Sequence, residues 1–154
     1  MSTADQQLTT AMPEAPAPLP ASAPIEAVVI DEGVAYVSGQ VAFVGESAPL
    51  LGKVGADVTV DQAIDEARKA AANGLYRLKA ALGSLDAVER ILKVTVFVNS
   101  TPDLTQQPSV ANGASQLLIE VLGDRGRHAR SAVGVASLPL GVPVEVELVA
   151  RVAA

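Results

Sequence analysis

The amino-acid sequence predicts a single α+β domain in which two helices cover one face of a mixed β-sheet. Short β-branched segments occur before, between and after two long segments whose apolar residues recur at helical spacing. This pattern gives the order β-β-α-β-α-β-β. The chain has 154 residues, of which 49% are hydrophobic and 18% are charged. That composition is sufficient for one buried core and excludes general disorder.

The first 25 residues are predicted to form a flexible leader, so that the folded domain covers residues 26–154. Five prolines, spaced mainly by alanine, lie between Pro13 and Pro24. Such a composition favours an extended, polyproline-like arm over a packed element. The segment has neither the basic start nor the apolar centre of a secretory signal peptide.

A β-hairpin is predicted at the start of the domain. Residues 27–30 and 34–37 are rich in β-branched side chains, and Asp31-Glu32-Gly33 between them has the composition of a turn. Residues 45–58 are rich in glycine and turn-forming residues and predict a loop.

The strongest helical pattern covers residues 60–82. Thr59 and Gln62 have the spacing of a capping box, and Gly83 stands where a C-terminal cap is expected. We place Gly74 inside the helix, because the apolar stripe continues in phase through it. The stripe consists of Val60, Ile64, Ala67, Ala71, Leu75, Leu78 and Leu82.

The second half of the domain is predicted to contain three strands and one helix. Residues 91–99 form a strand, and a helix follows that begins near Pro108 and ends at Gly123. The last two strands, residues 130–137 and 144–152, are joined by residues 138–143 and are expected to pair as an antiparallel hairpin.

The sheet face that carries no helices is predicted to be half polar and half apolar. Such a surface is too apolar to be only solvated and too polar to be an ordinary core, so we expect it to contact other copies of the chain in a closed oligomer. The residues of the middle and last strands expected on this face are Lys93, Thr95, Phe97, Glu145, Glu147, Val149 and Arg151.

Composition and motifs exclude several classes of function. The absence of cysteine removes disulfides, thiolate metal sites and cysteine nucleophiles. A net charge of -6 and only four aromatic residues argue against a nucleic-acid partner. No apolar run is long enough to span a membrane, so no membrane partner is expected, and the composition fits the cytoplasm.

No cofactor or metal is expected either. The sequence has no dinucleotide-binding or phosphate-binding glycine motif and no metalloprotease motif. His128, the only histidine, lies between Arg127 and Arg130 and is interpreted as structural. Glu145 and Glu147 share one face of a strand, but two ligands do not make a metal site.

One long segment carries a family resemblance. Residues 126–150 read GRHARSAVGVASLPLGVPVEVELVA. Together with Val-Ser-Gly-Gln at 37–40 and Val-Thr-Val-Phe-Val at 94–98, this segment resembles the RidA/YjgF family of reactive-intermediate deaminases, often labelled endoribonuclease L-PSP. The Gly-Arg-His-Ala-Arg-Ser wording is closer to a less characterised subgroup. The resemblance implies a chorismate-mutase-like fold, assembled as a homotrimer with clefts between subunits.

The resemblance also implies a reaction. Characterised members hydrolyse enamines or imines such as 2-aminoacrylate to 2-keto acids and ammonia, so the expected partner is a small carboxylate-bearing imine, enamine or keto acid. Arg130 matches the arginine that binds the substrate carboxylate, a role that suits a planar guanidinium. Glu145 matches the glutamate that positions the attacking water, and Ser38 and Gly39 match the turn beside the substrate.

Three further positions are expected near the substrate. Asn112 matches a family residue close to the cleft, whereas Ile25 stands where the best-known deaminases have a tyrosine and Ala132 where some have a cysteine. These two replacements remove a hydroxyl and a thiol, so the substrate and the activity stay open. Glu147 is expected to serve an ion pair or an interface rather than catalysis.

The predicted terminal hairpin would place Arg130 and Glu145 roughly 20 Å apart within one chain. Both residues can then serve one small substrate only if they come from different subunits. Two alternatives to a deaminase stay open. One is a non-catalytic trimer that binds small acids or regulates a partner through the same clefts. The other, more remote, is an endoribonuclease, against which the acidic charge, the few aromatic residues and the single histidine weigh.

Overall fold

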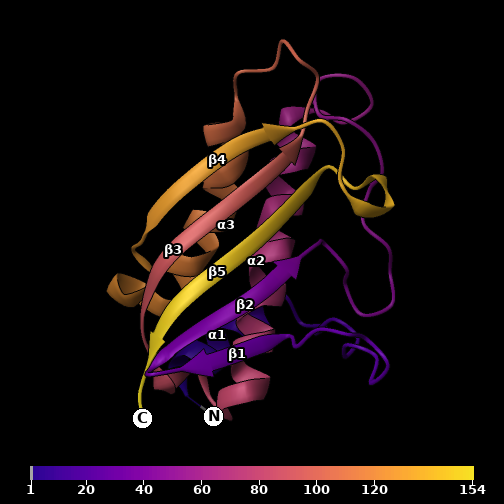
Figure 1. Ribbon diagram of the computed structural model, residues 1–154. Helices are drawn as coiled ribbons and strands as arrows, with labels where there is room; N and C mark the ends of the chain where they lie inside the picture. The colour runs from indigo at the N-terminus through magenta and orange to yellow at the C-terminus, as the bar shows by residue number, and fades with distance from the viewer. Residues whose placement is uncertain (1) are drawn as a thin grey trace.

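The computed structural model describes residues 2–154 and confirms the α+β architecture. One five-stranded sheet stands in front of the three α-helices in Figure 1. No helix formed by residues 2–154 is long and apolar enough to cross a membrane. The strands are β1 (Val28–Asp31), β2 (Val34–Gln40), β3 (Val88–Asn99), β4 (Ala129–Val135) and β5 (Val144–Val152). The α-helices are α1 (Thr3–Ala11), α2 (Val60–Leu82) and α3 (Gln107–Leu122), and the 3-10 helices are η1 (Leu85–Ala87), η2 (Gly123–Gly126) and η3 (Pro139–Gly141).

The strand order is β1-β2-β5-β3-β4, and it corrects the predicted terminal hairpin. β4 and β5 are not neighbours, because β3 lies between them, parallel to β4 and antiparallel to β5. Helix α3 returns the chain to the sheet edge as β4, and residues 136–143 then carry it past β3 to β5 (Figure 1). Alternation of apolar residues specifies which face of a strand is buried but not which strand lies beside it.

The predicted hairpin and the two predicted helices are confirmed. β1 and β2 are joined through Glu32 and Gly33, whose φ angles of 46° and 77° suit a tight hairpin turn. α2 begins with the capping box of Thr59 and Gln62 and ends at Gly83 in the left-handed conformation. Within α2, a Cβ at Gly74 would lie only 2.6 Å from Cδ1 of Leu148 in β5, so glycine allows the helix to approach the sheet closely.

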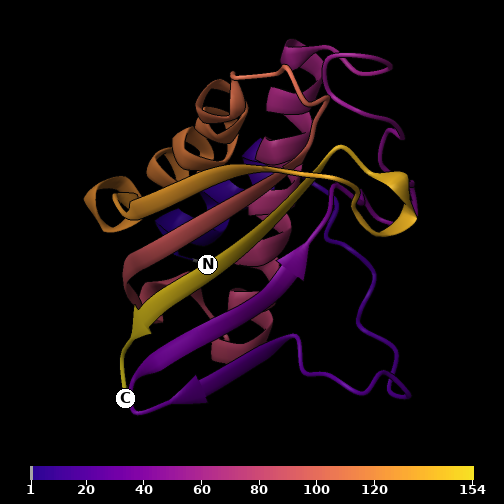
Figure 2. The ribbon, with the colours of Figure 1, turned by 45° about the horizontal axis from the view of Figure 1, so that its top comes forward.

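The face of the sheet opposite the helices carries no covering element among residues 2–154 (Figure 2). On β5, buried residues alternate with half-buried or exposed ones, as the sequence predicts. Val29 and Tyr36, each 51% exposed, pair across β1 and β2 on this outer face, and Val133 of β4 is 43% exposed. The outer face therefore has the mixed character expected of a contact surface.

Residues 2–11 differ from the predicted flexible leader. Residues 3–11 form α1, which packs on the helix side of the sheet against α2, α3 and η1. Ser2 caps this helix by accepting a hydrogen bond from the Asp5 N–H, and the side chain of Leu8 is fully buried. The prediction of a flexible leader depended on the prolines, which begin only at Pro13, after the helix has ended. Residues 12–27 contain no helix or strand.

A buried carboxylate fixes α1 to the body of the protein. Asp5, 3% exposed, accepts hydrogen bonds from the Leu85 N–H at 3.1 Å and the Ser84 hydroxyl at 3.0 Å. Burial alone would raise the pKa of Asp5, but these bonds, the contact with Ser2 and the charge of Lys79 outweigh burial and lower the pKa. The stabilisation is therefore present above the ordinary carboxyl pKa and is lost as the pH falls through the lowered value.

The docking of α1 can be tested by truncating its central apolar side chain. Replacing Leu8 with alanine is expected to lower the free energy of unfolding by about 3 kcal/mol, because it leaves a cavity between α1 and the other helices. Chemical denaturation of both proteins measures the difference. Thr10→Ala, at an exposed position of the same helix, is the control and should change stability little. Equal stability of the Leu8 variant and the wild type would contradict a docked α1.

Candidate active site

Arg130 lies on the helix side of the edge strand β4. It pairs with Val94 of β3, which is fully buried beneath the helices, so its side chain leaves the sheet toward α3. There Nη1 of Arg130 donates hydrogen bonds to Oδ1 of Asn112 at 2.9 Å and to Oγ of Ser115 at 3.2 Å. Arg130 and Asn112, both expected near the substrate, are thus in direct contact.

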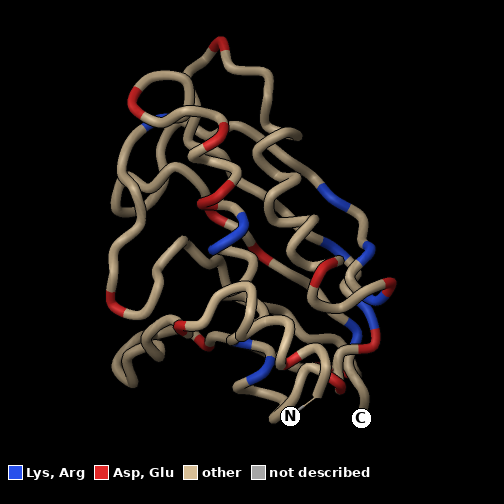
Figure 3. Tube along the Cα trace, turned by 180° about the vertical axis from the view of Figure 1, so that it is seen from behind, with Lys and Arg blue, Asp and Glu red and all other residues tan. Residues whose placement is uncertain are grey.

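The guanidinium of Arg130 has no acidic partner among residues 2–154, although acidic residues are spread along the chain (Figure 3). Both groups that hold Nη1 are neutral. The other edge of the guanidinium, formed by Nε and Nη2, donates to no residue in the described chain. A half-buried arginine with one edge fixed and the other free is suited to bind an external carboxylate through two parallel hydrogen bonds.

A hollow of about 230 Å³ lies beside this arginine. Its lining residues are Ser115, Ile119, Arg127, His128 and Arg130. Ala132 follows Arg130 by two residues, so it shares the helix face of β4, where it is half-buried against the core. The hollow leaves room for a small acid beside Arg130, and no residue in the lining carries a negative charge.

His128, interpreted from the sequence as structural, makes two hydrogen bonds beside Arg130. Its Nε2 lies 2.8 Å from Oγ of Ser115, and its Nδ1 lies 2.5 Å from the carbonyl oxygen of Gly126. Desolvation by burial lowers the pKa of His128, and the charge of Arg130 adds to this effect, while the bond to Gly126 opposes it. Sequence reasoning missed Ser115 entirely. The only feature of the sequence that could have identified Ser115 is its position three residues after Asn112, on the same face of the helix.

Glu145, at the start of β5, lies in a second cluster on the opposite face of the sheet. It pairs with Phe97 of β3, and its half-buried carboxylate rests against Gly39 of β2 so closely that a Cβ there would overlap it. Glu145 makes no hydrogen bond or ion pair with any of residues 2–154. Desolvation by burial raises the pKa of Glu145, and the negative charge of Glu147 raises it further.

Ser38 and Gly39 lie at a β-bulge next to Glu145. β2 pairs Val37 with Leu148 but Gln40 with Val146, so β2 contains one more residue than β5 between these two pairs. The bulge brings Gly39 against the carboxylate, as the sequence-based site requires. The Ser38 hydroxyl donates to the carbonyl oxygen of Glu26 at 2.6 Å. Ile25, just before β1, is 56% exposed.

The predicted site residues therefore fall into two half-sites within one chain. The helix-side half-site contains Arg130, Asn112 and Ala132, and the outer half-site contains Ser38, Gly39 and Glu145. The register places the Cα atoms of Arg130 and Glu145 two strands and three residues apart, or about 14 Å. The predicted separation of roughly 20 Å rested on the wrong strand pairing, but the conclusion that the two side chains do not meet in one chain holds more firmly, because they point to opposite faces.

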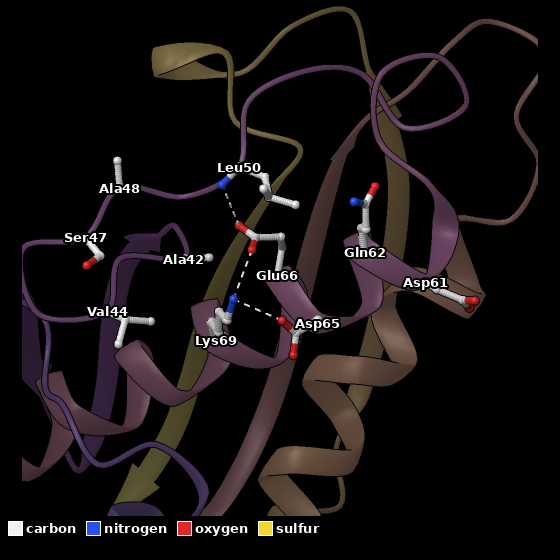
Figure 4. Close-up of a pocket in the computed structure, with 10 residues that line it drawn as sticks. All are labelled: Ala42, Val44, Ser47, Ala48, Leu50, Asp61, Gln62, Asp65, Glu66 and Lys69. Carbon is white, nitrogen blue, oxygen red and sulfur yellow. Dashed lines mark hydrogen bonds and ion pairs between the residues drawn. The ribbon is translucent and has the colours of Figure 1, made fainter.

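A larger hollow of about 590 Å³ lies elsewhere, between the loop after β2 and the start of α2 (Figure 4). Its buried Glu66 accepts from the Leu50 N–H at 3.2 Å and pairs with Lys69, which also pairs with Asp65. Lys69 thus pairs with two carboxylates of the chain itself, so the hollow keeps a net negative charge, which does not suit a carboxylate ligand. None of the predicted site residues lines this hollow. Among residues 2–154 there is also no group of three or more His, Cys, Asp or Glu placed to hold a metal ion.

Comparisons with known proteins agree with the fold and with the matched motifs. The family model described as Endoribonuclease L-PSP matches residues 14–152. Protein TCP17 of Trypanosoma cruzi is 48% identical over 113 residues, which are 73% of this chain and 71% of that protein. The crystal structure of Atu1372 from Agrobacterium tumefaciens, a protein of unknown function, superimposes with a TM-score of 0.89 at 38% identity over 99% of this chain and 94% of that one.

A second solved structure gives the same result. A putative endoribonuclease from Shewanella oneidensis superimposes with a TM-score of 0.91 at 29% identity and covers 98% of this chain and 100% of its own. The family match covers all five strands and both α2 and α3, and therefore both half-sites. The chain belongs to the endoribonuclease L-PSP family, the family of the RidA/YjgF proteins.

Proposed function

We propose that this protein hydrolyses small carboxylate-bearing imines and enamines, such as 2-aminoacrylate, to 2-keto acids and ammonia. In this reaction an enamine first gains a proton at its terminal carbon and becomes an imine. Water then adds to the carbon of the C=N bond, the nitrogen takes up protons and leaves as ammonia, and the oxygen remains as the ketone. The observation that carries the proposal is the half-buried Arg130, fixed by neutral groups and without an acidic partner among residues 2–154.

Arg130 is proposed to hold the substrate carboxylate. Its Nε and Nη2 edge matches the two oxygens of a carboxylate, and the hollow beside it provides space for the rest of a small acid. Because Asn112 and Ser115 already hold Nη1, little side-chain freedom is lost when the ligand binds.

Glu145 is proposed to accept a proton from the attacking water and to return it to the departing nitrogen. A carboxylate whose pKa is raised by burial and by Glu147 is a stronger base than an exposed one. The lack of a hydrogen-bonded partner within the described chain leaves its oxygens available to a water molecule. The Gly39 backbone lies against the carboxylate, and the Gly39 backbone and the adjacent Ser38 hydroxyl are proposed to orient that water.

The complete site is proposed to form where two copies of the chain meet, most simply in a homotrimer. Arg130 of one subunit and Glu145 of the next would flank one cleft. The two half-sites, which lie on opposite faces of the sheet within one chain, would then form one site between two chains. The exposed apolar side chains of the outer face provide the surface for such an assembly. Assembly would cover Val29 and Tyr36, and it would bring Ile25 near the cleft as an apolar wall.

Ammonia release provides the test of this function. Imines generated in solution by an amino-acid oxidase or a dehydratase should lose ammonia faster in the presence of the protein than in its absence. Glu145→Gln should reduce kcat by at least about 100-fold, whereas Glu147→Gln, two residues away on the same face, should retain most activity. Because the pKa of Glu145 is raised, the activity should fall with decreasing pH earlier than it would for an ordinary carboxylate base.

The same measurements separate the proposed enzyme from the alternatives. Binding of 2-oxobutanoate without any turnover of imines would contradict catalysis and support a sensor of small acids. RNA cleavage that disappears in the Glu145→Gln protein would contradict the proposal as well. The net charge of -6 disfavours binding of the RNA phosphate backbone, and the basic residues are interleaved with acidic ones along the chain (Figure 3).

A further inference from the structure

We infer that Ser115 and His128 are positioning residues, which hold the guanidinium of Arg130 in its ligand-binding orientation through a directed chain of hydrogen bonds. This inference rests on the proposed function, because it concerns the same carboxylate-binding edge of Arg130. It concerns two residues to which the family resemblance assigned no role, one from α3 and one from the segment before β4.

The direction of every hydrogen bond in the chain follows from its chemistry. The carbonyl oxygen of Gly126 can only accept, so Nδ1 of His128, 2.5 Å away, must carry the proton. In the neutral ring Nε2 is then an acceptor, and it receives the hydroxyl proton of Ser115 at 2.8 Å. With its proton committed to His128, the Ser115 oxygen presents its lone pairs to Nη1 of Arg130 at 3.2 Å.

The chain has a rigid anchor at its far end. Gly126 is buried in the last turn of η2, where a Cβ would overlap the carbonyl oxygen of Leu118 in α3. Its backbone is therefore packed directly on the helix that carries Asn112 and Ser115. The anchor and the two side chains that contact Nη1 belong to one packed unit, which reduces the freedom of the histidine ring between them.

The two acceptors at Nη1 determine which edge of Arg130 remains free. Asn112 and Ser115 use both protons of Nη1, one turn of α3 apart. This arrangement fixes the plane of the guanidinium and leaves Nε and Nη2 side by side, without a partner among residues 2–154. Without the Ser115 oxygen, Nη1 would keep one partner and the guanidinium could rotate about its bond to Asn112.

The charge of the imidazole is consistent with this role. Burial and Arg130 lower the pKa of His128, so the ring is neutral at neutral pH and can accept from Ser115. Arg127 and Arg130 are the charged side chains that share the hollow with it, and the charge of Arg130 disfavours a protonated ring.

A binding titration with 2-oxobutanoate, together with kinetics on the imine substrate, tests the inference. Ser115→Ala and His128→Ala should each raise Kd and KM about tenfold and leave kcat within about twofold, because they weaken carboxylate binding in substrate and transition state alike. Ser115→Thr retains the hydroxyl and should bind like the wild type. The double variant should be little weaker than either single one, since both break the same chain.

Two controls distinguish positioning from general damage. Ser109→Ala removes a hydroxyl from the same helix, at a half-buried site without a side-chain hydrogen bond to residues 2–154, and should leave Kd unchanged. The ¹⁵N shifts of the wild-type imidazole should show a proton on Nδ1 and none on Nε2 at neutral pH, a readout that requires no variant. A proton on Nε2 would overturn the inference.

Failure of this inference and failure of the proposed function give different results. If Arg130→Ala abolishes binding while Ser115→Ala and His128→Ala bind like the wild type, the positioning role is wrong and the carboxylate site stands. If Arg130→Ala binds 2-oxobutanoate as the wild type does, the proposed site itself is wrong.

Discussion

Replacing Arg130 with alanine is expected to lower kcat/KM for imine hydrolysis by at least about 100-fold and to abolish measurable binding of 2-oxobutanoate. The reason is the loss of a half-buried cation that has no acidic partner among residues 2–154 and lies beside a small hollow. Arg130→Lys should recover only a small part of the activity, because an ammonium retains the charge but not the planar pair of donors. Stopped-flow measurement of ammonia release and calorimetric titration provide the two readouts.

A matched control lies three residues away. Arg127 lines the same hollow but is exposed and pairs loosely with Asp124 at 3.5 Å. Arg127→Ala removes the same charge from the same hollow and should retain most of the binding. Equal losses in the Arg127 and Arg130 variants would indicate a general electrostatic effect and would contradict a specific carboxylate clamp.

Mixing two inactive variants is expected to restore activity. Arg130 and Glu145 point to opposite faces of the sheet, so a working site requires an intact arginine from one subunit and an intact glutamate from its neighbour. In any cyclic assembly of Arg130→Ala and Glu145→Gln chains mixed at random in equal amounts, roughly a quarter of the interfaces contain both intact residues. The mixture, after dissociation and reassembly, should therefore reach roughly a quarter of the wild-type rate.

The design contains its own negative control. Each variant dissociated and reassembled alone should stay inactive. A double variant that carries both substitutions in one chain, when mixed with wild-type chains, should add no activity to that of the interfaces between wild-type chains. No recovery in reassembled oligomers of confirmed mixed composition would show that Arg130 and Glu145 do not act in one intersubunit site.

Local patterns in the sequence predicted most of the fold. The capping box at Thr59, the glycine at position 83 and the alternation along residues 144–152 each specify structure through near neighbours in the chain, and each is confirmed. The neighbour of β5 could not be predicted in this way. Its pairing with β3 instead of β4 depends on contacts distant in sequence, about which the alternation of a single strand carries no information.

The candidate site was predictable to a similar degree. The family motif identified Arg130, Asn112, Gly39 and Glu145, and the structure groups them as two half-sites. Ser115 could not be found, because a serine inside a helix has no distinguishing pattern until α3 is placed beside β4. The sequence predicts a structural role for His128 because the neighbouring arginines disfavour its protonated form. Its hydrogen-bond partner, Ser115, becomes visible only in the structure.

The docking of α1 has a consequence for where this protein can be cut. The family match begins at residue 14, and the prolines up to Pro24 make a natural-looking boundary. Trimming the chain there would remove Asp5 and leave the buried N–H of Leu85 without its acceptor, and it would also strip Leu8 from the apolar surface of the helices. The folded domain therefore begins before the segment that the family model matches. Shortened versions intended for crystallisation or fusion should keep the residues that precede the proline arm.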